Sequence, residues 1–113
     1  MLEFDGRFRQ GSILFVNVPW CGYCREAYPI LEDVSRHFGN AIPVYDVNGD
    51  TWKEFFSVRL GNHAPRQYPT ILFIGADGRV STFDDERSVD AIVAWACSLD
   101  GHGDDVKACL TIQ

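Results

Sequence analysis

The apolar residues of this chain gather in short blocks whose spacing predicts strands and helices in alternation. Residues Ile13 to Val18 form a nearly continuous apolar run, which is typical of a strand buried on both faces of a parallel sheet. From Gly22 to Phe38, apolar residues recur at helical spacing, and Gly39 is placed to end that helix. The predicted apolar stripe of the helix consists of Ala27, Ile30, Leu31, Val34 and Phe38.

The same alternation continues to residue 60. A second strand is predicted from Ile42 to Val47. The sequence Thr51-Trp52-Lys53-Glu54 then has the form of a capping box, which predicts the start of a helix. We expect this helix to bury Trp52, Phe55, Phe56 and Leu60. A loop from Gly61 to Tyr68 should follow it.

An antiparallel pair of strands and one more helix are predicted in the last third of the chain. Thr70 to Ile74 and Arg79 to Phe83 flank the sequence Gly-Ala-Asp-Gly, a turn composition that joins antiparallel strands. Asp84 or Asp85 is placed to cap a final helix that ends near Leu99. The apolar stripe of that helix consists of Val89, Ile92, Val93 and Ala96.

The two ends of the chain carry weaker signals. Residues 1–11 can hold one edge strand around Leu2 to Phe4, but hardly a strand and a full helix. Residues 100–113 begin with a polar, glycine-rich stretch, and the sequence predicts no structure for this tail. We therefore expect one domain over residues 1–113, with its core at about residues 12–99. The order of the predicted elements supports an α/β class with an antiparallel edge.

Composition narrows the classes of function. The chain has 113 residues, 46% of them hydrophobic, which is enough for one core and too few for two. Its 16 acidic and 10 basic residues give a net charge of −6, which argues against binding to nucleic acid or to an anionic membrane. The sequence contains no apolar run that could span a membrane and no recognisable signal peptide. We therefore expect a soluble cytoplasmic protein whose partners are other proteins.

The candidate chemistry lies in two cysteines that follow the first apolar run. Cys21 and Cys24 stand at the predicted start of a helix, close enough for a reversible disulfide, and Gly22 is expected to relieve backbone crowding between them. The unpaired N–H groups and the positive dipole end of a helix stabilise an anion. We therefore expect Cys21 to be the nucleophile. Cys24, one turn deeper and less exposed, should resolve a mixed disulfide.

Two stretches of the chain together resemble one known family, the thioredoxin-like proteins. The first is Trp20-Cys21-Gly22-Tyr23-Cys24, followed by Pro29 five residues after the second cysteine. The second is Tyr68-Pro69-Thr70, far downstream and directly before a predicted strand. The resemblance covers residues 12–99, and the sequence around the first cysteine leans toward the form seen in protein disulfide isomerase domains.

The resemblance implies the thioredoxin fold, a three-layer α/β/α arrangement around a central mixed sheet, here with an abbreviated amino-terminal strand and helix. It also implies a cis peptide bond before Pro69, which would face the cysteine pair and shape a groove for an extended substrate segment. The residues expected to contact the substrate are Trp20, Gly22, Tyr23, Tyr68 and Pro69.

One position departs from the family. Many members carry a buried Asp or Glu six residues before the first cysteine, where it helps to move the proton of the second cysteine. This chain has Phe15 there. Asp46, on the next predicted strand, is either a substitute for that carboxylate or a solvated residue at a strand end.

The cysteines and histidines also have simpler interpretations. The CxxC pair could be half of a zinc site or an inert disulfide, but zinc needs four ligands and the sequence offers no second close pair. Cys97 lies beside the apolar stripe of the last helix, so a buried inert thiol is favoured, with a bridge to Cys109 as the alternative. His63 and His102 are expected to be solvated loop residues. We therefore expect neither a metal nor a cofactor.

Together these residues predict thiol–disulfide exchange on protein substrates. In the favoured direction Cys21 and Cys24 reduce protein disulfides, and an electron-donating reductase or a thiol pool restores the dithiol. The alternatives are a protein disulfide oxidase or isomerase, and a redox-competent docking module with little turnover. The Gly-Tyr pair between the cysteines does not decide between these directions.

Overall fold

Five strands form one mixed sheet in the computed structural model of this protein, which describes residues 1–99 and 107–110. Their order across the sheet is β1-β3-β2-β4-β5. The central strand β2 pairs in parallel with β3 and antiparallel with β4. At the edges, β1 pairs in parallel with β3, and β5 pairs antiparallel with β4. The strands are β1 (Leu2–Glu3), β2 (Ser12–Asn17), β3 (Val44–Asn48), β4 (Thr70–Ile74) and β5 (Val80–Thr82).

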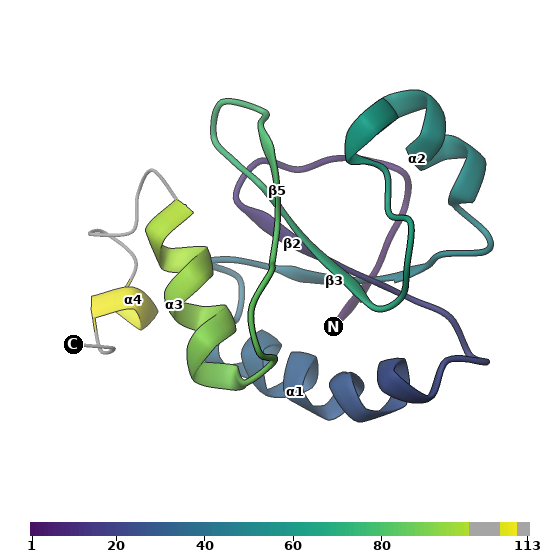
Figure 1. Cartoon of the computed structure of the whole chain (residues 1–113). Coiled ribbons are helices and arrows are strands. Elements are labelled where there is room, and N and C mark those ends of the chain that lie inside the picture. The colour runs from purple at the N-terminus through teal and green to yellow at the C-terminus, as the bar shows by residue number, and fades with distance from the viewer. Residues whose placement is uncertain (100–106, 111–113) are drawn as a thin grey trace.

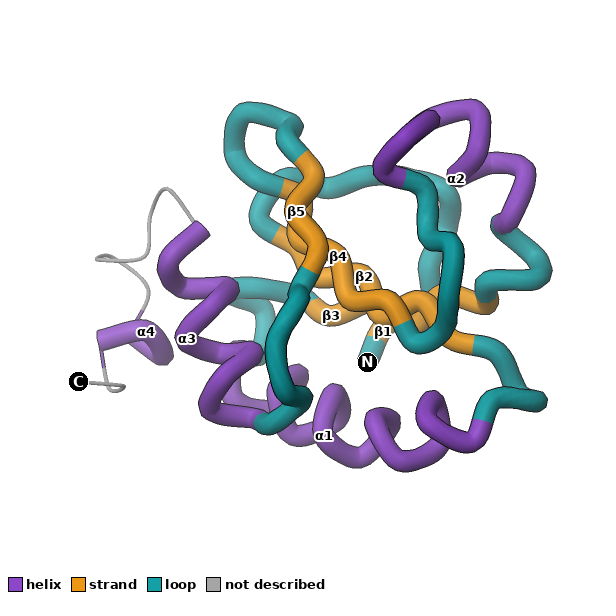
Figure 2. Tube along the Cα trace, viewed as in Figure 1, coloured by secondary structure: helices purple, strands orange, loops and turns teal. Residues whose placement is uncertain are grey.

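Helices cover both faces of this sheet (Figures 1 and 2). On one face lie α1 (Gly22–Phe38) and α3 (Val89–Leu99), and on the other lies α2 (Lys53–Leu60), followed by a short 3-10 helix, η1 (Gly61–His63). Beside α3 lies a single turn, α4 (Lys107–Leu110). The structure therefore has the three layers, the mixed sheet and the abbreviated amino terminus of the expected thioredoxin fold.

Each face of the sheet has its own core because successive residues of a strand point to opposite faces. On β2, Ile13 and Phe15 face α1 and α3, whereas Leu14 and Val16 face α2. The α1 face also buries Leu31, Val34, Ile71, Phe73, Ile92 and Val93. The α2 face also buries Tyr45, Val47, Phe56, Leu72 and Ile74. Burial on both sides explains why β2 reads as a continuous apolar run.

Most predicted elements are present, and several bounds match. Helix α1 has the predicted bounds, and Gly39 ends it with φ of 56°, a conformation that glycine adopts without strain. Strand β4 also matches, and its turn to β5 is closed by a hydrogen bond from the Gly75 N–H to the Arg79 carbonyl. The other strands shift by one or two residues at their ends.

Two predicted helix caps are wrong. Helix α2 begins at Lys53, and its N-cap residue Trp52 makes no side-chain cap. The side chain of Asn48 instead binds the loop before that helix, because its Oδ1 accepts hydrogen bonds from the N–H groups of Asp50 and Thr51. Helix α3 is capped by Ser88, whose Oγ accepts a hydrogen bond from the Ala91 N–H, and not by either aspartate.

```
```

Aromatic side chains of the loop between β1 and β2, which contains no helix, cover part of the sheet. Phe4 is buried, and its ring lies 5.0 Å from that of Trp52 and 5.8 Å from that of Phe56. Phe8 lies 5.5 Å from Phe55. These rings join the amino-terminal loop to α2, so part of the sheet face is closed by packing between a loop and a helix.

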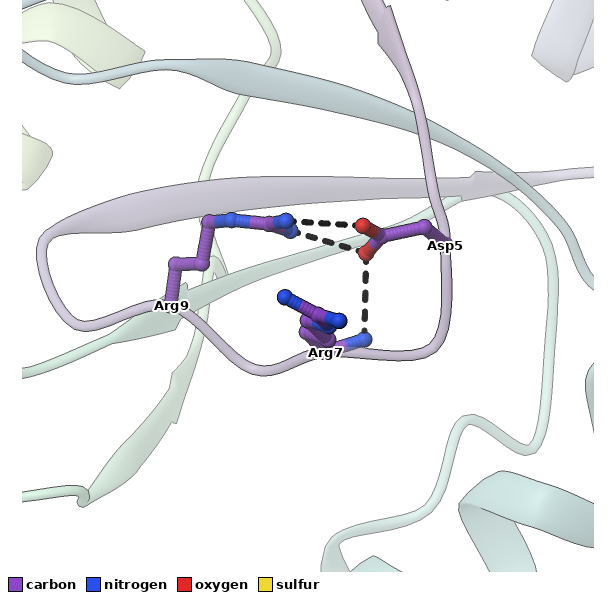
Figure 3. Close-up of polar contacts among 3 residues, drawn as sticks. All are labelled: Asp5, Arg7 and Arg9. Atoms are coloured by element: carbon purple, nitrogen blue, oxygen red, sulfur yellow. Dashed lines mark hydrogen bonds and ion pairs between the residues drawn. The ribbon is translucent and has the colours of Figure 1, made fainter.

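A local ion pair holds the same loop in shape (Figure 3). The guanidinium of Arg9 donates two hydrogen bonds, of 2.8 and 2.7 Å, to the carboxylate of Asp5, which also accepts one from the Arg7 N–H. The hydrogen bonds from Arg9 hold the pKa of Asp5 well below its ordinary value. Arg9 also lies over the ring of Tyr45, so the loop is fixed to β3.

The second pair of cysteines forms a disulfide. Cys97 of α3 is bonded to Cys109 of α4, and Cys109 is buried in the core on the α1 face. The favoured expectation of an inert thiol at Cys97 is therefore wrong, and the alternative is correct. The His37 side chain at the end of α1 contacts the Ala108 carbonyl at 3.0 Å, which adds a second tie to this turn. The remaining residues of the predicted tail lie outside the described residues.

Removing this disulfide should lower the free energy of unfolding by about 3 kcal/mol, because a cross-link over 12 residues restricts the unfolded chain. The measurement is urea unfolding of two proteins. The background protein, Cys21→Ala/Cys24→Ala, keeps only the Cys97–Cys109 pair, and the quadruple variant also carries Cys97→Ala/Cys109→Ala. Adding reductant should destabilise the background protein and leave the quadruple variant unchanged. Equal stability of the two proteins without reductant would contradict the prediction.

Candidate active site

Two free thiols stand at the start of α1, where β2 delivers the chain to the helix. Cys21 is the N-cap residue, and its Sγ accepts a hydrogen bond from the Cys24 N–H at 3.2 Å. Cys21 is 8% exposed and Cys24 2% exposed, so the first thiol is the more accessible. One otherwise unpaired N–H of the first helical turn is thus directed at the Cys21 sulfur, where it stabilises negative charge.

A distant segment completes the surroundings of the two sulfurs. The Cys21 Sγ donates a hydrogen bond of 3.6 Å to the carbonyl of Tyr68, and the Tyr68–Pro69 peptide bond is cis. Tyr68 also packs against the small cluster formed by Val18 and the two cysteines. The two stretches that carry the family resemblance therefore meet in space, although 47 residues separate Cys21 from Tyr68.

Burial makes Cys24 a weak acid. Its pKa rises from the ordinary 9.0 to about 11, first because burial disfavours the thiolate and then because of the hydrogen bond and negative charge of Cys21. A backbone hydrogen bond involving Val18 and, more weakly, the positive charge of Arg87, in the loop before α3, act in the opposite direction and lower this pKa. Cys24 is therefore a neutral thiol near pH 7.

Two exposed aromatic rings flank the thiols. Trp20 is 65% exposed and Tyr23 67% exposed. The Trp20 indole donates a hydrogen bond of 2.9 Å to Asp50 Oδ2, and its ring meets the edge of Tyr68 at 5.8 Å. The site thus presents a partly apolar surface to solvent around a recessed sulfur.

The backbone before Cys21 is held by Arg25, whose guanidinium donates two hydrogen bonds to the Pro19 carbonyl. Beyond its chain neighbours and the backbone of its own helix, a Cβ at Gly22 would meet no other group within 4 Å, so no contact from a distant part of the chain requires this glycine.

Phe15 occupies the position at which the family resemblance implies a buried carboxylate. It is fully buried in β2, and Asp46 is its partner in the register with β3. The Asp46 carboxylate accepts hydrogen bonds from Asn17 at 2.7 Å and from the Tyr28 hydroxyl at 3.1 Å. Burial and then the charge of Asp46 raise the pKa of Tyr28. Asp46 is thus half-buried in the middle of β3 and tied into a local polar cluster, and it is not a solvated residue at a strand end.

The family model described as Thioredoxin matches residues 4–98. This chain belongs to the thioredoxin family. Thioredoxin from Borreliella burgdorferi is 34% identical over 77 residues, which cover 68% of this chain and 62% of that protein. The protein disulfide-isomerase of Ricinus communis is 29% identical over 77 residues, again 68% of this chain but only 15% of the relative.

Solved structures agree with this membership. The first thioredoxin domain of mouse protein disulfide-isomerase A4 superposes with a TM-score of 0.58 at 25% identity, over 77% of this chain and 61% of that one. The chain thus resembles both a free-standing thioredoxin and one domain of a longer isomerase. It spans less than two thirds of either curated relative, so the activity and partners of those whole proteins do not transfer directly.

The structure brings the predicted site residues together and adds others. Trp20, Cys21, Tyr23, Cys24 and the Tyr68–Pro69 segment all lie around the sulfurs. Sequence analysis missed Asp50 and Arg87. Asp50 follows a strand parallel to β2, so its position at the same edge of the sheet could have been anticipated. For Arg87 the sequence contains no such signal, because its loop is placed by the packing of α3.

Within residues 1–99 and 107–110, no helix is both long and apolar enough to cross a membrane. Nor do those residues bring three or more His, Cys, Asp or Glu side chains together as a metal site would require. His63 is exposed in η1, and His102 lies outside the described residues.

Replacing Arg87 with glutamine should raise the pKa of Cys24 above its value in the parent protein, because a nearby positive charge is lost. The measurement is an NMR titration of the Cys24 ¹³Cβ resonance in the reduced protein, with Arg79→Gln in the distant β4–β5 turn as the control. An unchanged or lower pKa would contradict the assignment.

The raised pKa of Cys24 also makes the free energy of unfolding depend on pH. A pKa that folding raises favours the folded state while the thiol is protonated in both states, and this benefit disappears as the folded thiol ionises. The contribution of Cys24 should therefore be present below pH 9 and be lost as the pH rises toward 11. The measurement is urea unfolding of the reduced protein and of Cys24→Ala across this pH range. If the free energies of unfolding of the two proteins change in parallel with pH, the prediction is wrong.

Proposed function

We propose that this chain catalyses thiol–disulfide exchange on protein substrates through Cys21 and Cys24. The observation that carries the proposal is the Cys24 N–H directed at the Cys21 sulfur at the start of a helix, with the second thiol buried one turn below. Membership of the thioredoxin family supports the same chemistry.

The reaction has two balanced steps. The Cys21 thiolate attacks one sulfur of a substrate disulfide, so a Cys21–substrate disulfide forms and the other substrate sulfur leaves as a thiolate. The Cys24 sulfur, after losing its proton, then attacks Cys21, and the second substrate thiol is released. The substrate gains two electrons, and the enzyme ends as the Cys21–Cys24 disulfide. A reductase or a thiol pool must return two electrons to complete the cycle.

The surface around the sulfurs supports proteins as the substrate class. Trp20 and Tyr23 are exposed rings beside a recessed sulfur, and Tyr68, directly before Pro69, contacts that sulfur through its carbonyl. Exposed aromatic residues of this kind serve as anchors for protein partners. An extended segment could also pair with the backbone near Pro69.

Reduction of protein disulfides is the favoured direction, and oxidation or isomerisation is the second candidate. The resemblance to protein disulfide-isomerase and the Cys97–Cys109 disulfide favour the second candidate. Structural disulfides persist chiefly in oxidising compartments, so this bond weighs against the cytoplasmic location that the sequence predicts.

The roles of the two cysteines can be tested by trapping. Cys24→Ser should accumulate mixed disulfides with substrate proteins, because nothing resolves the Cys21–substrate bond, whereas Cys21→Ser should form almost none. The measurement is non-reducing electrophoresis after incubation with a disulfide-containing protein, with a reduced lane as the control. Equal trapping by both variants would reverse or abolish the assignment of the nucleophile.

The direction of the reaction follows from the reduction potential of the Cys21–Cys24 pair. A glutathione-buffer titration that gives a reduction potential of about −270 mV would support a reductase. A potential of about −180 mV would support an oxidase or isomerase. Insulin reduction with a thiol donor tests turnover independently. Redox activity of the cysteine pair without insulin turnover would favour a docking module with little catalysis.

A further inference from the structure

The loop after β3 contacts two aromatic rings beside Cys21, those of Trp20 and Tyr68. Asp50 accepts the indole hydrogen bond of Trp20 at 2.9 Å. Gly49 is buried against the ring of Tyr68, and a Cβ at position 49 would lie 2.3 Å from the Cε1 and 2.6 Å from the Cζ of that ring. The loop thus holds one ring and leaves room for the other.

The loop is itself fixed to the sheet. The Gly49 N–H donates a hydrogen bond of 2.9 Å to the carbonyl of Asn17, the last residue of β2. The Asn48 side chain accepts hydrogen bonds from the N–H groups of Asp50 and Thr51 at 2.9 and 3.1 Å. Gly49 and Asp50 are therefore held relative to the strand that leads to Cys21.

Fixing the rings matters because Trp20 is largely exposed. An exposed side chain usually samples several rotamers, and ordering it on binding costs affinity. Here the hydrogen bond to Asp50 and the edge contact with Tyr68, at 5.8 Å and an interplanar angle of 82°, hold the indole before any substrate arrives. The two rings thus form a preorganised wall on one side of the site.

We propose that Gly49 and Asp50 are positioning residues that determine the substrate range of this redox centre. They hold Tyr68 and Trp20 as a wall that receives a bulky apolar side chain next to the reacting cysteine of the substrate. The inference rests on the proposed function and adds a substrate class to it, namely polypeptide disulfides with an apolar residue beside the cysteine.

The test compares three disulfides. Two are peptide disulfides that differ only by leucine or serine next to the cysteine, and the third is bis(2-hydroxyethyl) disulfide, which has no side chain to place. The parent protein should reduce the leucine peptide with a kcat/KM about threefold to tenfold above that of the serine peptide, as expected for one partly buried apolar side chain.

Variants of Asp50 separate the hydrogen bond from the charge. Asp50→Ala removes the acceptor and should abolish most of the preference for leucine, mainly through KM. Asp50→Asn keeps an acceptor without the charge and should retain the preference. Glu54→Ala, which removes an acidic residue from the first turn of α2, is the matched control. The indole ¹⁵N–¹H resonance of Trp20 should move in Asp50→Ala and not in the control.

Variants of Gly49 test the second contact. Gly49→Ala should displace the Tyr68 ring and reduce the preference for leucine. A leucine at position 68 lacks the Cε1, Cζ and hydroxyl atoms that a Cβ at position 49 would meet. Tyr68→Leu should reduce the preference by itself, because it removes the aromatic ring. Gly49→Ala should add nothing further in that background, because the atoms that its Cβ would displace are absent. If Gly49→Ala alone does not fold, the contact between Gly49 and Tyr68 is tested by comparing Tyr68→Leu with the Gly49→Ala/Tyr68→Leu double variant.

The outcomes distinguish the inference from the proposed function. A parent protein that reduces all three disulfides but does not distinguish leucine from serine would overturn the inference alone. Full preference in Asp50→Ala, or equal loss in Asp50→Ala and Asp50→Asn, would also overturn it. A parent protein that reduces none of the three would overturn the proposed function and the inference with it.

Discussion

The carboxyl end of β2 meets the start of α1 at Trp20 and Cys21, and this junction places every other group of the site. Strand β3 runs parallel to β2, so its following loop, with Gly49 and Asp50, emerges at the same edge of the sheet. Strand β4 runs antiparallel, and the register of Val16 with Thr70 puts its first residues at that edge too. Segments far apart in the sequence therefore converge on one sulfur because of strand direction alone.

Burial of both faces is the second constraint on the fold. A sheet with apolar side chains on both sides must be covered on both, and the connection between β1 and β2 contains no helix. Phe4 and Phe8 cover part of that face by packing against α2, and the Asp5–Arg9 ion pair shapes the loop that carries them. The sheet thus keeps a three-layer structure with less chain than a full helix would need.

Phe15 puts an aromatic ring where the family resemblance implies a buried carboxylate beside the second thiol. An aromatic ring adds no charge, so the groups that act on the pKa of Cys24 include Cys21, which raises it, and Arg87, which lowers it. Asp46 faces the same helix, but Asn17 and Tyr28 hold its carboxylate. Burial is the main cause of the raised pKa of the deeper sulfur, and the positive charge of Arg87, in the loop before α3, lowers that pKa only weakly.

The sequence by itself determined the helices, the strands, the hairpin turn and the cysteine pair, because each is encoded by residues close together in the chain. The periodicity of α1, the continuous apolar run of β2 and the Gly-Ala-Asp-Gly turn need no distant partner. Tertiary structure alone decided the Cys97–Cys109 bond, the contact of Cys21 with Tyr68, and the hydrogen bond between Trp20 and Asp50. A periodic pattern reports which face of an element is buried, but not which residue, 30 or 47 positions away, lies against it.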